Sequence, residues 1–397
     1  MEDHSEERDE ENVEEEQEEL DISHPEVVTK YKTAAEICNK AIKTLAEECV
    51  PGKKIVELCV HGDALITEGC TKVYSKAHDE EDEPMLKGIA FPTTVCVNNC
   101  CAHFSPSVPD ETEIHAGDVV QISMGCHIDG FIATGAHTVI VAGEARDRKA
   151  DCVIAASKAL ECAVRMMRPG THNYDITAAI NKIAAAYHCQ LVEGVVSHEM
   201  KRFIIDGNKC IMNRPSLDAH VEPVDIEANE VYSLDIVMST GEGKTREVIE
   251  KPTIFKRAVD QNYMLKMKSS RLVFSEINAK FPSMPFALRQ LETKSARMGL
   301  TEMISHNLLV PYPVLFEKDG ETVARFNATV LVMPSTIHRI TGALPIPATV
   351  VSEHHITDPE LLRVLDMSLA KKKKKKTVAA AAAPAPAADA KKEEESK

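Results

Sequence analysis

The chain of 397 residues contains no tryptophan, and its aromatic content is only 4%. Surfaces that stack unpaired bases or enclose a quaternary ammonium depend on aromatic rings, so neither activity is expected to dominate. No uninterrupted run of about 18 apolar residues is present, which argues against membrane insertion. The first residues are acidic, whereas a secretory leader starts with a basic and then an apolar segment.

Cysteine is abundant, with twelve residues, but no Cys-x-x-Cys pair occurs. Zinc ribbons and thioredoxin-like redox sites use that spacing, so neither is expected. A chain without a secretory leader is expected in the cytosol or nucleus, where thiols stay reduced. We therefore expect the thiols to fill the core.

The formal net charge of −16 is distributed unevenly along the chain. Residues 1–21 hold 13 acidic side chains and one arginine, a charge of −12, and residues 371–397 carry +5. Residues 244–297 hold 12 basic and five acidic side chains, a charge of +7, which leaves −16 for the remaining residues. A basic segment on an acidic body favours a polyanionic partner.

Composition also predicts the domain organisation. Residues 1–22 form an acidic disordered N-terminus, and residues 371–397 form a Lys-rich disordered tail, because neither segment can bury apolar surface. Residues 23–370 form the folded domain. Within it, the basic segment at about 244–305 interrupts the surrounding pattern and is interpreted as an inserted subdomain.

Two parts of the folded domain repeat the same order of elements. Apolar residues recur at helical spacing on both sides of two Pro-Gly dipeptides, Pro51-Gly52 and Pro169-Gly170. The strand pattern at 117–124 matches the one at 229–236, and a third strand is predicted at 326–333. Each pattern is common alone. The two Pro-Gly dipeptides lie 118 residues apart and the two matching strands lie 112 residues apart, and these similar separations favour two related halves of one α/β unit.

An ordered series of motifs resembles the type-two methionine aminopeptidases over roughly residues 24–370. The matching segments are Gly88–Thr93, Val97–Asn99, Cys101–Pro106, Gly117–Gly125, Ile132–Thr138, Glu193-Gly194 with His198, Asn229–Lys244 and Phe326–Pro334. The resemblance implies the α/β (α+β) pita-bread fold of the methionine aminopeptidase and creatinase type. It also implies two pseudo-symmetric halves and identifies the basic segment with the helical insertion of type two.

Active members of that family hold two divalent metals with two Asp, one His and two Glu, because carboxylates neutralise the neighbouring cations. The resemblance places these five ligand positions on Ser123, Thr134, His198, Asp235 and Asn327. Three of the positions carry neutral side chains, so we expect no dinuclear metal, no cofactor and no peptidase activity. A single metal held loosely by His198 and Asp235 is the alternative.

Two further positions follow from the same resemblance. His103 takes the place of a substrate-contacting histidine, and Asp206 takes the place of a second pocket histidine. We therefore expect a vestigial pocket that contains His103 together with the five positions above.

Other segments resemble a branch of the fold without peptidase activity, the proliferation-associated (ErbB-receptor-binding) proteins. They are Lys266–Arg271, Phe274–Glu276, Met284–Arg289 and Ala296–Gly299. The run of six lysines that follows the folded domain, Lys371–Lys376, is also typical of this branch. This resemblance implies binding to the large ribosomal subunit, rRNA and pre-ribosomal particles, in the cytoplasm and in the nucleus or nucleolus.

Clustered basic side chains bind phosphates of structured RNA largely by shape and charge. The candidate RNA contacts are Lys251, Lys256, Arg257, Lys266, Lys268, Arg271, Arg289, Lys294, Arg297, Lys371, Lys372, Lys373, Lys374, Lys375 and Lys376. The alternative interpretation of the basic segment is an ordinary solvated helix surface.

The sequence thus favours a non-catalytic ribosome-associated RNA-binding factor that acts in ribosome biogenesis, translation regulation and growth control. Two alternatives stay open. One is a residual metalloaminopeptidase, and the other is a signalling or transcription corepressor adaptor that binds a receptor tail or repressors.

Overall fold

The computed structural model describes residues 20–77, 84–215, 221–247, 251–293 and 296–369. The predictions of disorder for the first 19 residues and for 371–397 lie outside these residues. None of the described helices is both long and apolar enough to cross a membrane.

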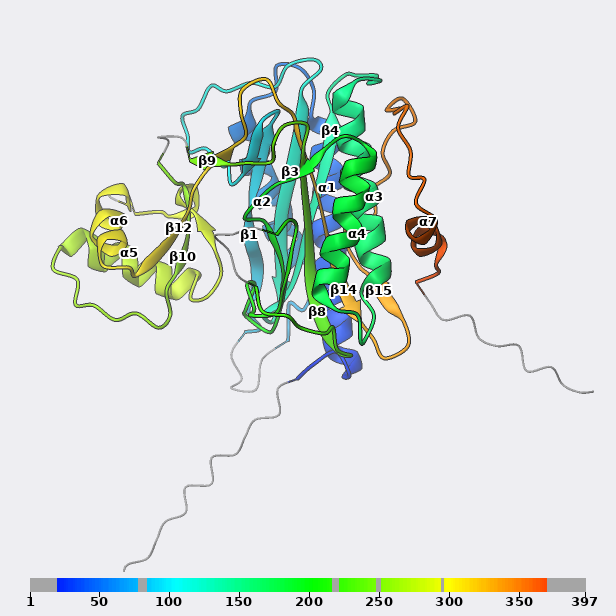
Figure 1. Ribbon diagram of the computed structural model, residues 1–397. Helices are drawn as coiled ribbons and strands as arrows, with labels where there is room; N and C mark the ends of the chain where they lie inside the picture. The colour runs from blue at the N-terminus through cyan, green and yellow to red at the C-terminus, as the bar shows by residue number, and fades with distance from the viewer. Residues whose placement is uncertain (1–19, 78–83, 216–220, 248–250, 294–295, 370–397) are drawn as a thin grey trace, which may run out of the picture.

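A nine-stranded antiparallel sheet forms the centre of the molecule (Figure 1). Its main path runs β1-β3-β4-β14-β8-β6-β7, with β15 beside β14 and β5 beside β8. The strands are β1 (Lys87–Val97), β3 (Val119–Ile128), β4 (Phe131–Ile140), β5 (Gln190–Leu191), β6 (Val196–Glu199), β7 (Cys210–Met212), β8 (Glu230–Ser239), β14 (Val323–Val332) and β15 (Ile337–Arg339). The strands predicted at 117–124, 229–236 and 326–333 correspond to β3, β8 and β14.

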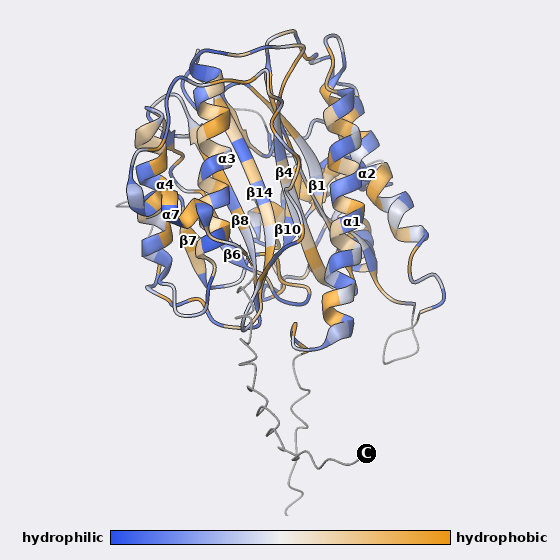
Figure 2. Cartoon of the chain, turned by 90° about the vertical axis from the view of Figure 1, so that its right-hand side faces the viewer, coloured by the Kyte–Doolittle hydropathy of each residue, from blue (hydrophilic) through white to orange (hydrophobic). Residues whose placement is uncertain are grey.

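Four helices cover one face of this sheet, as Figure 2 shows. They are α1 (Pro25–Glu48), α2 (Ile55–Thr71), α3 (Arg148–Met166) and α4 (Asn173–Ala186). Alternate strand residues point toward them. Ile122 and Met124 of β3 pack with α1 and α2, whereas Leu234 and Ile236 of β8 pack with α3 and α4. The intervening residues face away from the helices.

The two halves repeat each other in hydrogen-bonding detail. Gly52 N–H donates to Ile114 O at 2.8 Å, and Gly170 N–H donates to Ile226 O at 2.8 Å. Both glycines have a φ of 84°, a left-handed conformation that favours glycine. Gly117 and Asn229, which precede β3 and β8, also have positive φ values. The predicted duplication is therefore confirmed.

The basic segment folds against the side of the sheet that the four helices leave open (Figure 1). It contains β10 (Ile254–Arg257), α5 (Lys268–Lys280), β11 (Phe286–Ala287), η1 (Leu288–Gln290), α6 (Ala296–Ser305) and β12 (Leu309–Tyr312). Strands β11, β10 and β12 form a separate sheet, and Val273, Ile277 and Leu300 belong to a separate apolar cluster. We propose that this unit is the inserted subdomain and that it extends past residue 305 to Tyr312.

The remaining elements connect these layers. Strands β2 (Cys100–Ala102), β9 (Arg246–Glu247) and β13 (Leu315–Phe316) form a second small sheet, and α7 (Pro359–Asp366) follows the last strand. The cysteines are free thiols, and all but half-buried Cys210 are buried. The expectation that the thiols fill the core is confirmed for eleven of the twelve.

Candidate functional site

A cavity of about 320 Å³ lies on the sheet face opposite the four helices. All six residues predicted for a vestigial pocket line it: His103, Ser123, Thr134, His198, Asp235 and Asn327. Asp206 also lines it. The structure therefore brings together in one cavity residues that are spread over more than 200 positions of the chain.

Strand register explains why these side chains meet. Ser123 of β3 lies opposite Ala136 of β4, which lies opposite Asn327 of β14, which lies opposite Asp235 of β8. These residues form one row across four neighbouring strands. Because successive side chains alternate between sheet faces, this row points into the cavity while its neighbours pack against the helices.

A second group of polar side chains forms a closed hydrogen-bonded ring. Asn327 Nδ2 donates to Ser233 Oγ at 2.9 Å, Ser233 Oγ lies 2.7 Å from Thr134 Oγ1, and Thr134 Oγ1 donates to Asn327 Oδ1 at 2.9 Å. If Ser233 donates to Thr134, each group in the ring donates one hydrogen and accepts one. The three neutral side chains thereby satisfy one another.

Asp235, the carboxylate retained among the five ligand positions, is paired with Arg325. Arg325 Nε and Nη2 donate to Asp235 Oδ1 and Oδ2 at 2.8 and 2.5 Å, in a two-pronged arrangement. Both side chains are mostly buried, with 14% and 11% of their surface exposed. The guanidinium therefore neutralises the carboxylate from within the chain.

The sequence analysis missed both Arg325 and Ser233. Arg325 lies two residues before Asn327 on β14, so strand alternation places both on the cavity face. The available signal was an arginine as the one charged residue of the central strand β14. Strand alternation places Ser233 on the same face as Asp235. The contact of Ser233 with Asn327 depends on the pairing of β8 with β14, which the local sequence does not show.

The two histidines of the cavity are fixed by backbone carbonyls. His103 Nδ1 lies 2.9 Å from Pro313 O and must donate to it, which leaves Nε2 as an acceptor. Burial, with a smaller contribution from the charge of Arg325, lowers the pKa of His103 to about 4. His198 Nδ1 lies 3.2 Å from Gly207 O and 3.3 Å from Cys210 Sγ.

These residues do not fit a pair of divalent metals. Such a site needs several deprotonated oxygen ligands, but the ring is neutral and Asp235 already binds a guanidinium. Among the described residues, no three His, Cys, Asp or Glu side chains are grouped so that they could hold a metal ion.

Comparisons with known proteins agree with this geometry. The sequence profile of metallopeptidase family M24 matches residues 29–251. The chain belongs to family M24. ERBB-3 binding protein 1 of Solanum tuberosum is 52% identical over 331 residues, which span 83% of this chain and 84% of that protein. Proliferation-associated protein A of Dictyostelium discoideum is 43% identical over 343 residues, with coverage of 85% and 88%.

A solved structure of a thermophilic Arx1 matches this M24 protein with a TM-score of 0.81 at 30% identity. It covers 88% of this chain and all of the other. The predicted pita-bread fold is confirmed, and so is the resemblance to the proliferation-associated (ErbB-receptor-binding) branch of the family.

The structure divides the basic residues of this M24 protein into several groups. Lys266, Lys268 and Arg271 are exposed and lie within about one turn at the start of α5. Arg271 Nη1 donates to Leu265 O at 3.0 Å and to Lys266 O at 2.8 Å, which orders the turn that precedes the helix. We name these three residues the α5 cluster.

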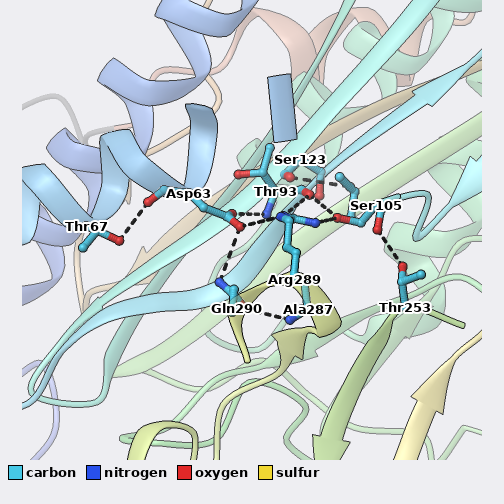
Figure 3. Close-up of polar contacts among 10 residues, drawn as sticks. Asp63, Thr67, Thr93, Ser105, Ser123, Thr253, Ala287, Arg289 and Gln290 are labelled. Carbon is cyan, nitrogen blue, oxygen red and sulfur yellow. Dashed lines mark hydrogen bonds and ion pairs between the residues drawn. The ribbon is translucent and has the colours of Figure 1, made fainter. Parts of the chain in front are cut away.

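Arg289 is not part of an exposed surface. Its guanidinium binds Asp63 Oδ2 through Nε at 3.0 Å and Nη2 at 2.6 Å, and it also binds Thr93 O and Ser105 Oγ (Figure 3). The side chain is only 7% exposed. Charge patterning cannot reveal this contact, because Asp63 lies 226 residues earlier in the chain. We therefore omit Arg289 from the proposed RNA surface.

The other candidates among the described residues have different surroundings. Lys256 pairs with Asp206 at the cavity, and the Arg257 guanidinium lies 5.7 Å from the centre of the Phe274 ring. Arg297 is exposed and lines a separate groove beside α2, and Lys251 is exposed before β10. Lys294 and the run Lys371–Lys376 lie outside the described residues.

Proposed function

We propose that this M24 protein is a non-catalytic factor that binds the large ribosomal subunit and rRNA through its inserted subdomain. In this role it acts in ribosome biogenesis, translation regulation and growth control, in the cytoplasm and in the nucleus or nucleolus. The observation that carries the proposal is the Arg325–Asp235 pair, which neutralises the retained carboxylate of the ancestral metal site.

The cavity supports the loss of peptide hydrolysis on electrostatic grounds. A dinuclear hydrolase uses its metals to generate a hydroxide and to polarise the scissile carbonyl. Here the cavity offers the neutral ring of Thr134, Ser233 and Asn327, and a carboxylate already bound to a guanidinium. Neither arrangement supplies the negative charge that would retain two cations.

The α5 cluster supports a phosphate-binding role. Its three basic side chains are exposed at a helix N-terminus, where the helix dipole adds positive potential. Glu302 accepts hydrogen bonds from the backbone N–H groups of Lys266 and Met267 at 2.7 and 3.1 Å, so the segment is held in place. No described residue forms an ion pair with Lys266 or Lys268.

The proposed absence of peptidase activity is tested by metal analysis of the purified chain and by an assay on Met-Ala peptides. We expect less than stoichiometric metal and no turnover, also after Mn²⁺ or Co²⁺ is added. Stoichiometric metal together with turnover would overturn the proposal. An active type-two methionine aminopeptidase assayed in parallel serves as the positive control.

The proposed binding to the large ribosomal subunit is tested by co-sedimentation with large ribosomal subunits at several salt concentrations. Reversal of the α5 cluster to Glu should weaken association about tenfold or more at low salt and flatten its salt dependence, because phosphate contacts release counterions. A matched control reverses three exposed lysines of α1, Lys32, Lys40 and Lys43, on the opposite side of the sheet. Equal losses in both variants would contradict docking through α5.

A further inference from the structure

The cavity keeps an apolar wall around a few unpaired polar atoms. Phe91, Ile205, Tyr312 and Leu315 line it together with the polar row. The rings of Phe91 and Tyr312 meet edge to face, with centroids 5.5 Å apart. Its volume of about 320 Å³ is at the lower end of the roughly 300–1,000 Å³ typical of small-molecule sites. The space suits a ligand of about the size of one amino acid.

Arg325, His103 and Ser123 each present a polar atom that has no partner among the described residues. Arg325 uses Nε and Nη2 on Asp235, so Nη1 keeps its hydrogens for another acceptor. His103 uses Nδ1 on Pro313 O, so Nε2 keeps its lone pair for another donor. Ser123 is 9% exposed, and its Oγ can either donate or accept a hydrogen bond.

The formal charges of the cavity are already balanced. Asp235 is paired with Arg325, Asp206 is paired with Lys256, and burial keeps His103 neutral near pH 7 because its pKa is lowered to about 4. A ligand with an ammonium or carboxylate group would therefore bring an uncompensated charge into a mostly apolar space, at a large desolvation cost. An uncharged ligand avoids this cost.

We propose that this cavity binds a small uncharged amide with an apolar substituent. The amide carbonyl accepts from Arg325 Nη1, an amide N–H donates to His103 Nε2, and the substituent packs against Phe91 and Tyr312. An amide matches because it carries both an acceptor and a donor without net charge. The inference rests on the proposed loss of the metal pair but not on RNA binding.

The test compares three probes of similar size that differ in charge, by calorimetry and ligand-observed NMR on the full chain with EDTA at about pH 6.5. The probes are N-acetyl-L-leucinamide, which is neutral, L-leucinamide, which is mostly an ammonium below its α-amino pKa, and N-acetyl-L-leucine, a carboxylate. We expect the neutral amide to bind about tenfold or more tightly than either charged probe. Equal or tighter binding of a charged probe, or binding of none, would overturn the inference.

Two variants locate the bound amide. Arg325→Lys keeps a cation beside Asp235 but removes the free guanidinium nitrogen, so affinity for the neutral amide should fall about tenfold. Val196→Phe, at a half-buried position of the cavity wall, should abolish binding by filling the space. Lys40→Gln on the exposed surface of α1 should leave affinity unchanged. Full affinity in both cavity variants would overturn the inference.

A metal titration separates this inference from the proposed function. Binding that appears only after Mn²⁺ replaces EDTA would overturn both, because a metal would then be the anchor. Metal-independent lack of binding would overturn the amide inference alone and leave the non-catalytic role standing.

Discussion

Single residues decide the chemistry of the cavity. Arg325 occupies the position from which a positive charge compensates Asp235, so this carboxylate is neutralised from within the chain. The sequence located Asp235 from a family motif. It did not reveal the arginine, because a salt bridge between two strands depends on their pairing and register.

Replacing Arg325 by Leu should lower the free energy of unfolding by about 3–5 kcal/mol, because Asp235 would remain as a buried charge without a partner. The double variant Arg325→Leu/Asp235→Leu should recover most of this loss. Urea unfolding of both single variants and the double variant gives the coupling energy. Additive losses would show that the pair is not coupled.

Buried histidines predict a loss of stability in acid. Burial lowers the pKa of His103, His127 and His137 to about 4, whereas an unfolded histidine titrates near 6.5. The unfolded chain therefore takes up protons first as the pH falls. Stability is complete above about pH 6.5 and decreases as the pH drops from 6.5 toward 4.

The variant His103→Asn tests this dependence, since asparagine tolerates the positive φ of 64° at this position. The difference in unfolding free energy between pH 7 and pH 5 should shrink by roughly 1–2 kcal/mol relative to the unmodified chain. Exposed His115 replaced by Asn is the control and should leave the difference unchanged. If the unfolding free energy depended on pH in the same way in both variants, burial of His103 would not be a cause of the loss of stability in acid.

At the scale of elements, one buried contact anchors the inserted subdomain to the sheet. Arg289 of η1 reaches Asp63 of α2 and Thr93 of β1, and Asp63 Oδ1 accepts from Thr93 N–H at 2.8 Å (Figure 3). The sequence predicted the insertion from its charge but assigned this arginine to the surface group. Composition reports how many charges a segment carries and not which of them become buried.

Arg289→Met should lower the free energy of unfolding by about 3–5 kcal/mol and accelerate amide exchange in residues 254–312, because Asp63 would lose its buried partner. Lys280→Met is the matched control, since Lys280 is itself exposed and its ion pairs with Glu276 and Glu292 are worth at most about 1 kcal/mol. Hydrogen exchange read by mass spectrometry distinguishes the two. Unchanged exchange in the insertion would contradict an anchoring role.

At the scale of the whole molecule, the two halves account for most of what the sequence predicted. Pro-Gly turns and alternating strands are local patterns, so their recurrence exposed the duplication before any contact was known. The order β1-β3-β4-β14-β8 was not predictable in the same way, because β14 joins the halves from a distant part of the chain. The family resemblance implied the two-halved fold, whereas the pairing of β14 with β4 and β8 became known only from the structure.

The duplication predicts equal responses in the two halves. Gly52→Ala and Gly170→Ala should each cost about 1–2 kcal/mol, because both positions have a φ of 84° and no atom lies within 4 Å of an added Cβ. Gly62→Ala should cost more, since its Cβ would lie 2.5 Å from Thr93 Oγ1 and 2.8 Å from Leu45 Cδ1. Thermal unfolding compares the three, and a large difference between Gly52 and Gly170 would argue against equivalence.

The closed ring of Thr134, Ser233 and Asn327 has an evolutionary consequence. A single change of Thr134 or Asn327 to a carboxylate would place an anion among groups that already satisfy each other, beside a guanidinium whose charge is already balanced by Asp235. Each single substitution toward the ligand set of the active aminopeptidases would therefore cost stability before any metal could bind. The ring thus acts as an energetic barrier to the stepwise appearance of a metal site in this cavity.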